Sequence, residues 1–299
     1  MKYTLRKAVA GDVPEIEITE EDYLTYQQVR KVLSNCLAIE EKYEILISNY
    51  LEFEKQIVNR IVSNMIRNEH GYSDLFTIRL QLNVCLVNLL TSARLYVDQL
   101  QQHVAVCMPD YADAKKTVEA LFSKEYDAYL EYRFMEALRN YVQHCGIPVH
   151  WVSSGARWTD LGKDGFLEYF MEVASLRSLL QEDKRFKKSV LDEIGDKVDL
   201  IASTRCYIEC FSNVHEAVRQ MIKEPVANAR KTLEEAHNQY RKVYDKNLVG
   251  LSACIQSEDG IVEYFPLLLD WDDVRIKLQK RNQKMTNLKK RYATGKIKN

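Results

Sequence analysis

The sequence predicts a mainly α-helical protein, and three observations support this fold class. The 299 residues include only 10 Gly and 5 Pro, too few for the many turns of an all-β fold. Apolar residues make up 46% and charged residues 28%, as is usual for globular proteins with a buried core. Apolar side chains also recur three or four positions apart over long stretches. These observations favour long helices and exclude a wholly disordered chain.

The first half of the chain predicts a short arm followed by three helices. Gly11 and Pro14 interrupt the first 18 residues, which predict a small strand or an irregular arm. Thr19, as an N-cap followed by acidic residues, predicts the start of the first helix. The three helices are expected over about 23–67, 73–106 and 112–145.

The second half predicts strands mixed with long helices. Strand character is expected over 148–152, 166–170 and 248–267, and helical character from about 175 and over 191–244. Pro225 is a potential kink within the last of these helices. The predicted regions are an N-terminal arm (1–18), a helical core (19–147), an α+β region with long helices (148–274) and a basic tail (275–299).

The net charge of −1 conceals a basic end. Residues 275–299 contain ten Lys or Arg and no acidic residue, which leaves 32 basic and 43 acidic residues in the rest of the chain. Such a tail predicts contact with a polyanion, with Lys289, Lys290 and Arg291 as candidate substrate contacts. The alternative is a solvated, partly helical end that only keeps the chain soluble.

Compartment signals predict a cytoplasmic protein without a membrane anchor. Met1 leads into mixed polar residues, so no signal peptide is expected. The most apolar stretch, residues 80–97, contains Asn83 and Arg94 and is expected to be a buried helix rather than a membrane span. Seven cysteines without a regular framework are typical of a reducing compartment.

One polar constellation lies at the end of the third predicted helix, where Gly146 marks a C′ position. A helical wheel places His144 about 40° from Asn140 on one flank of the apolar stripe. Arg139 lies about 140° from His144 on the opposite flank by the same geometry. We therefore expect a polar face outside the core, with the remaining arc occupied by Arg133, Glu136 and Gln143.

These residue types suit a phosphoryl-transfer reaction that needs no metal. Histidine both takes and gives a proton near neutral pH, and the end of a helix favours its charged form. Arginine offers a planar fork for phosphate oxygens, and asparagine orients either group. Together Arg139, Asn140 and His144 suit attack of an RNA 2′-hydroxyl on its neighbouring phosphate. The nucleophile belongs to the substrate, so neither a metal nor a cofactor is expected.

The spacing Arg139-Asn140-x-x-x-His144 at the end of a long helix resembles the R-x4-6-H signature of HEPN domains. The resemblance covers roughly residues 20–147 and implies a HEPN-like antiparallel helical bundle with small β-hairpins in the α+β C-terminal region. It implies a metal-independent endoribonuclease in toxin–antitoxin or antiviral defence, with Arg139 and His144 catalytic and Asn140 supporting. It also implies RNA as substrate, a homodimer that joins two motifs in one cleft, and an antitoxin or regulatory protein as a further partner.

Two interpretations without catalysis remain open beside this one. Arg139 can pair with Glu136 on the surface while His144 caps the helix end. The whole chain can then be a non-catalytic helical module that senses a nucleotide or docks a partner protein. Arg133 and Gln143 are the candidate substrate contacts next to the motif if RNA does bind.

Overall fold

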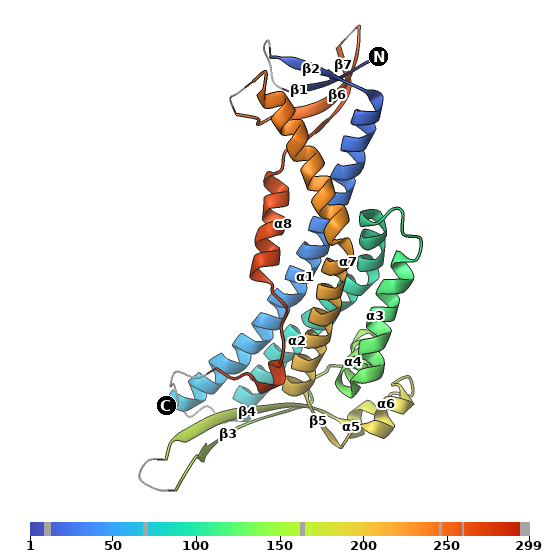
Figure 1. The fold of residues 1–299 in the computed structure, drawn as a ribbon. Helices are drawn as coiled ribbons and strands as arrows, with labels where there is room; N and C mark the ends of the chain where they lie inside the picture. Colours follow the sequence, from blue (N-terminus) through green and yellow to red (C-terminus); the bar gives the residue numbers. More distant parts are fainter. Residues whose placement is uncertain (9–12, 68–70, 162–164, 245–246, 259, 294–299) are drawn as a thin grey trace. The chain divides into compact units, whose positions relative to one another are not determined.

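Helices form most of the protein, and short antiparallel sheets complete it (Figure 1). The computed structural model describes residues 1–8, 13–67, 71–161, 165–244, 247–258 and 260–293. The α-helices are α1 (Glu20–Ile66), α2 (Tyr72–Cys107), α3 (Ala114–Ala128), α4 (Leu130–His144), α5 (Arg177–Leu180), α6 (Lys188–Glu193), α7 (Leu200–Arg241) and α8 (Asp270–Arg281). The strands are β1 (Lys2–Lys7), β2 (Glu15–Ile18), β3 (Trp151–Trp158), β4 (Leu167–Leu176), β5 (Lys197–Asp199), β6 (Leu251–Ser257) and β7 (Gly260–Pro266). The predicted mainly α class with small β-hairpins is confirmed.

The chain forms two compact units, and each is assembled from segments that are far apart in the sequence. Unit 1 comprises 1–41, 99–118 and 217–283, whereas unit 2 comprises 42–98, 119–216 and the described residues that follow 283. The helices α1, α2, α3 and α7 contribute residues to both units. This division does not follow the region boundaries expected from the sequence, because periodicity along the chain carries no information about which helices pack together.

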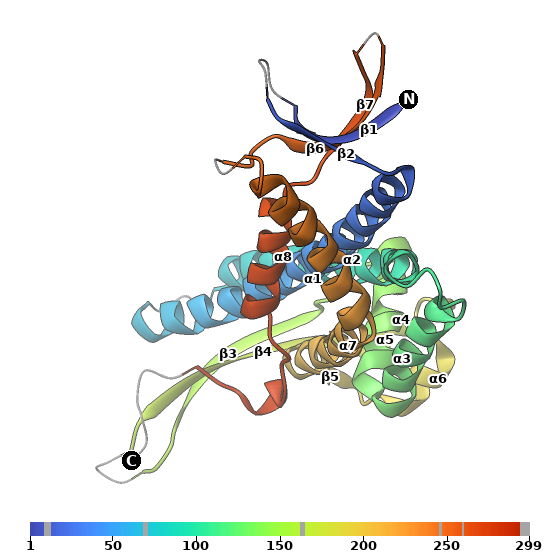
Figure 2. The ribbon, with the colours of Figure 1, turned by 45° about the horizontal axis from the view of Figure 1, so that its top comes forward.

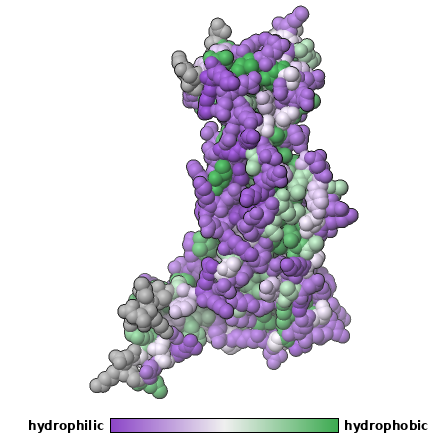
Figure 3. All heavy atoms as spheres, in the orientation of Figure 1, coloured by the Kyte–Doolittle hydropathy of each residue, from purple (hydrophilic) through white to green (hydrophobic). Residues whose placement is uncertain are grey.

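Unit 1 contains a four-stranded sheet with the order β2-β1-β6-β7. All three pairings are antiparallel, and β1 brings the start of the chain beside β6 (Figure 1). The expected N-terminal arm is therefore an integral part of a sheet. The side chains of Ile261 and Val262 on the edge strand β7 stay exposed, and Figure 3 shows hydrophobic surface over this sheet.

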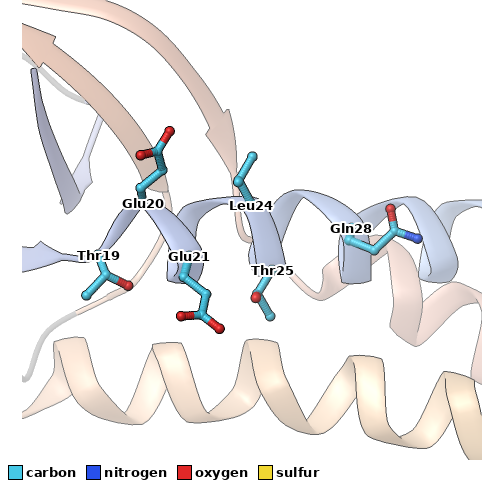
Figure 4. A pocket seen from close by; sticks show the side chains of 6 residues that line it. All are labelled: Thr19, Glu20, Glu21, Leu24, Thr25 and Gln28. Carbon is cyan, nitrogen blue, oxygen red and sulfur yellow. The ribbon is translucent and has the colours of Figure 1, made fainter.

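The start of α1 follows the chemistry expected of its cap. The Thr19 hydroxyl accepts a hydrogen bond from the Asp22 backbone N–H at 3.0 Å, and the Asp22 carboxylate accepts one from the Thr19 N–H at 2.9 Å. This reciprocal pair satisfies two backbone donors that a helix start otherwise leaves unpaired. Figure 4 shows Thr19 at the first turn, beside a shallow surface depression lined by polar side chains and Leu24.

A buried ion-pair network fixes α8 in unit 1. Asp272 is fully buried and accepts hydrogen bonds from Arg275 at 2.5 Å and from Arg230 of α7 at 2.6 Å. Arg275 is itself buried, at 5% exposure. The first residue of the expected basic tail thus belongs to the core. The region expected as a basic tail thus begins inside α8, where the buried Asp272 neutralises the charge of Arg275. Residues 294–299 lie outside the described part of the chain.

Unit 2 is built around aromatic side chains of α1, α2, α4 and α7. The Tyr43 ring stacks on the His215 ring with 3.7 Å between centroids, and the Tyr96 hydroxyl lies 2.8 Å from His215 Nδ1. Tyr132 of α4 packs against Tyr207 of α7, with 5.1 Å between their centroids. A three-stranded sheet with the order β3-β4-β5 completes this unit (Figure 2).

Two helix boundaries in unit 2 differ from the expected ones. The predicted helix over 112–145 is two helices, because Tyr129 between them is extended, with φ −126° and ψ 120°. Arg133 stabilises the break by donating hydrogen bonds of 3.1 Å to the carbonyls of Tyr126 and Asp127 at the end of α3. The long helix expected from 191 begins only at Leu200, because the Asp199 carboxylate caps its first turn.

The helix α2 is the one described helix that is long and apolar enough to cross a membrane. Its most apolar window has a mean hydropathy of 1.3, and 44% of that window is buried. Leu82, Leu86, Leu89 and Leu90 are at most 1% exposed in unit 2. A buried core helix of this composition was expected from the sequence.

Candidate functional site

The helix α4 carries the candidate motif and buries two of its faces. Tyr132 packs on α7, while Phe134 and Tyr141 pack on Phe186, which lies just before α6. Leu138 is fully buried, as expected for the apolar stripe. The second buried face was not visible in the sequence, because it depends on α7 covering a side of α4 that carries polar residues.

Arg139 lies on this second buried face. Its side chain is 10% exposed, and Nη2 donates a hydrogen bond of 3.1 Å to the Glu136 carboxylate. The same carboxylate accepts a hydrogen bond of 2.5 Å from the Tyr207 hydroxyl, and burial raises the pKa of Tyr207 well above its ordinary value. The expectation that Arg139 lies outside the core was wrong. The alternative pairing of Arg139 with Glu136 is the one present.

The exposed face of α4 carries the other motif residues. Asn140, Gln143 and His144 are all exposed, and they follow one another around the last turns of the helix. Arg133 is half-buried at the start of the same face, where Nη2 donates a hydrogen bond of 2.6 Å to Glu193 of α6. The structure therefore places Asn140 and His144 on one accessible face and separates Arg139 from them.

An arginine that the sequence analysis did not single out lies at the C-terminal end of α4. Arg185 Nη2 donates a hydrogen bond of 3.2 Å to the His144 carbonyl oxygen, and Nε lies 3.2 Å from the Asp183 carboxylate. Asp183 also accepts a hydrogen bond of 2.5 Å from the Cys145 thiol, which lowers the pKa of Asp183. A guanidinium is thus held next to the backbone of His144.

The chain beyond His144 is fixed by backbone contacts on several sides. Gly146 is the expected C′ residue, and a Cβ there would lie 2.5 Å from the Tyr141 hydroxyl. The buried Asn83 of α2 accepts a hydrogen bond of 2.8 Å from Val149 N–H and donates one of 3.2 Å to Val149 C=O. His150 Nδ1 accepts a hydrogen bond of 3.0 Å from the Leu176 N–H. These contacts hold the chain that follows α4 against α2 and β4.

A basic segment runs beside this end of α4. Lys184-Arg185-Phe186-Lys187-Lys188 places four cationic side chains in five residues, and all four are exposed. Phe186 is 5% exposed and anchors the segment through Phe134 and Tyr141. The run is visible in the sequence as a charge cluster around a single aromatic residue. Only the fold brings it next to the motif.

A depression of about 260 Å³ lies between the basic segment, α4 and the end of α3. Its lining includes Asn140 and Arg133 of α4, Tyr126 of α3, and Arg185 and Lys187 of the basic segment. The Lys187 ammonium contacts the Tyr126 hydroxyl and lies 4.7 Å from the centre of the Tyr126 ring. One motif residue, Asn140, thus shares a concave surface with three cations.

The tail residues expected to contact substrate lie elsewhere. Lys289 forms an ion pair with Glu131 at the start of α4, and the Arg291 carbonyl accepts a hydrogen bond from Arg205. Glu131 and His144 are 13 residues apart on one helix, a separation of about 20 Å. Backbone N–H groups of Asn287 and Leu288 bind the Glu209 carboxylate and hold the tail against α7. Lys290 is exposed. The structure does not bring Lys289 to the motif, because Glu131 holds it at the opposite end of α4.

Among the described residues, no group of three or more His, Cys, Asp or Glu side chains is arranged to hold a metal ion. All seven cysteines are free. Comparison of the chain with protein-family models, curated proteins and solved structures finds no match.

Proposed function

We propose that this chain binds RNA at the C-terminal end of α4 and cleaves it as a metal-independent endoribonuclease. The observation that carries the proposal is the exposed His144 side chain, because the Arg185 guanidinium donates a hydrogen bond to the backbone carbonyl oxygen of the same residue, His144. A proton-transfer group and a phosphate-binding group then lie at the same helix end. The resemblance of the motif to HEPN domains supports the same function.

The reaction proceeds by transesterification within the substrate. His144 takes the proton of the 2′-hydroxyl, the 2′-oxygen bonds to the adjacent phosphorus, and the bond from phosphorus to the 5′-oxygen breaks. The leaving 5′-oxygen takes up a proton, which leaves a 2′,3′-cyclic phosphate and a 5′-hydroxyl. Arg185 neutralises the charge that grows on the phosphate oxygens, and Asn140 orients the phosphate.

This assignment changes the role of Arg139. Its guanidinium forms a largely buried ion pair with Glu136. In this proposal Arg139 therefore has a structural role in α4 and does not bind the phosphate. Arg185 takes the phosphate-binding role because its side chain is 66% exposed at the His144 end. A homodimer would supply a second His144 as the general acid for the leaving oxygen.

The test is a cleavage assay with purified protein and a short single-stranded RNA in EDTA. We expect cyclic-phosphate products from the wild type, no cleavage of an all-deoxy strand of the same sequence, and loss of activity in His144→Ala. Arg157→Ala, which removes an exposed side chain of β3 that has no role in the proposed site, is the control and should retain activity. Specific activity should also fall on dilution below the dimer dissociation constant.

The non-catalytic alternative is favoured by the Arg139–Glu136 pair, which removes one motif residue from the surface. Equal RNA cleavage by the wild type and His144→Ala would identify a contaminating nuclease and contradict the proposal. RNA binding without cleavage would support a binding module instead.

A further inference from the structure

The depression beside α4 has the charge and the donors of an anion site. It is walled by three elements, and its volume of about 260 Å³ equals that of roughly nine water molecules. This space is sufficient for a phosphate group and part of the sugar that carries it. The pocket opens on the side of α4 that carries Asn140, four residues before His144.

The charges around the depression leave one cation without a carboxylate partner. Arg133 pairs with Glu193, and Arg185 pairs with Asp183. Glu136, which also lines the depression, is held by Arg139. Lys187 contacts the Tyr126 hydroxyl and has no ion pair with a described carboxylate. The pocket therefore carries a positive surplus, and the exposed Lys184 and Lys188 flank it in the sequence.

Polar side chains that line the depression are accessible to a ligand. The Asn140 side chain is exposed, and most of the Arg185 side chain faces solvent. Cations that retain N–H donors, together with an amide, match the oxygens of a phosphate group.

We propose that this depression binds a terminal phosphate, carried either by an RNA strand or by a mononucleotide. A terminal phosphate monoester has a charge near −2 at pH 7, so it gains more from the positive surplus than a singly charged diester does. The three walls suit a group that ends a strand rather than one that continues through it. The RNA form of this inference rests on the proposed function, because it places the strand end beside the cleavage site.

Binding of uncleavable strands tests the subsite separately from the chemistry. The probes are 2′-O-methyl oligonucleotides of one sequence, with a 5′-phosphate, with a 3′-phosphate, or with hydroxyl groups at both ends. We expect one phosphate-ended strand to bind about tenfold more tightly than the hydroxyl-ended strand at equal salt, as measured by fluorescence anisotropy. Calorimetry with AMP, inorganic phosphate and adenosine reports whether a free nucleotide is also a ligand.

Two lysines of the basic segment provide matched variants. Lys187→Ala should abolish the preference for the phosphate-ended strand, whereas Lys184→Ala, outside the lining, should weaken all strands equally and retain the preference. Unchanged melting temperatures will show that both variants are folded. AMP binding without a strand-end preference would assign the pocket to free nucleotides and support the phosphate site.

The proposal is overturned if phosphate-ended and hydroxyl-ended strands bind alike and AMP does not bind. Equal effects of Lys187→Ala and Lys184→Ala on the preference would also overturn it. Because no probe can be cleaved, a failure of RNA cleavage by His144 leaves this result unaffected. Conversely, the cleavage assay on hydroxyl-ended RNA does not depend on the terminal-phosphate site.

Discussion

Arg139 and His144 belong to one sequence motif, yet their side chains lie in opposite environments. The His144 ring is exposed, whereas the Arg139 side chain is 10% exposed and bound to Glu136. The difference arises because Tyr132, Glu136 and Arg139, at spacings of four and three residues, share the face that meets α7. A helical wheel gives these directions correctly but does not show which neighbour covers each one.

Removing the Arg139 side chain should destabilise the fold. Arg139→Ala leaves the half-buried Glu136 carboxylate with only Tyr207, so we expect a loss of about 1–3 kcal/mol in the free energy of unfolding. Arg157→Ala breaks an ion pair whose arginine is 72% exposed and should change stability by about 0–1 kcal/mol. Urea unfolding of both variants measures the difference. Equal free energies of unfolding for Arg139→Ala and Arg157→Ala would show that the contact of Arg139 with Glu136 does not stabilise the fold.

His150 should make the fold sensitive to acid. Burial is the main cause of its lowered pKa, and the Arg79 charge adds to it, so the folded protein disfavours the protonated ring. The unfolded chain then binds more protons below pH 6.5, and stability falls as pH decreases through that value toward the folded pKa. His150→Asn keeps an acceptor for the Leu176 N–H and should reduce the loss of melting temperature between pH 7 and 5. Parallel pH curves for the variant and the wild type would contradict this assignment.

Among the elements, the basic segment before α6 and the C-terminal tail offer two alternative sources of cations for RNA. The segment is anchored by Phe186 on α4, next to His144. The tail is held along α7 by Glu209, and its Lys289 is paired with Glu131. A cation that already has a carboxylate partner gains less from a phosphate. Lys184, Lys187 and Lys188 of the segment have no ion pair with a described carboxylate, so these lysines are stronger candidates than Lys289.

The salt dependence of RNA binding distinguishes the two elements. Lys184→Ala combined with Lys188→Ala should make the negative slope of log K, the RNA association constant, against log salt less steep by about 1.4. Each lost phosphate contact removes about 0.7 from the steepness for a single strand. Lys289→Ala combined with Lys290→Ala should leave the slope close to that of the wild type. Titrations at several salt concentrations with an uncleavable strand provide the slopes. The opposite pattern would return RNA binding to the tail.

At the scale of the whole molecule, the strand β1 near the start of the chain and the helix α8 near its C-terminal end are structural parts of unit 1. β1 pairs with β6, and α8 contributes Asp272 and Arg275 to a buried network with Arg230. The fold of this unit therefore depends on segments separated by more than 200 residues. Such long-range pairing has no signal in local periodicity, so the sequence indicated a small strand or an irregular arm at the start and a basic tail at the end, but no partner for either.

Deleting residues 275–299 should therefore impair folding rather than only weaken RNA binding. The deletion removes Arg275 and leaves the fully buried Asp272 with one fewer partner, which is a strongly destabilising change. We expect a lower melting temperature and a broader unfolding transition by circular dichroism. Lys289→Ala with Lys290→Ala, which removes tail charge without altering α8, should retain the wild-type melting temperature. A stable, cooperatively folded deletion would show that α8 is dispensable.

The sequence by itself determined the helical class, the cap at Thr19, the end of a helix just before Gly146 and the strands β6 and β7. Each of these features depends on local chemistry, namely the spacing of apolar residues, a capping side chain or a glycine. Only the tertiary structure decided that Arg139 is buried, that Arg185 lies at His144, and that Asn83 fixes Val149. These contacts join residues 3 to 66 positions apart, and their energy depends on which helix faces meet. The charge cluster 184–188 was readable as a pattern, but its place beside α4 was set by the packing of Phe186.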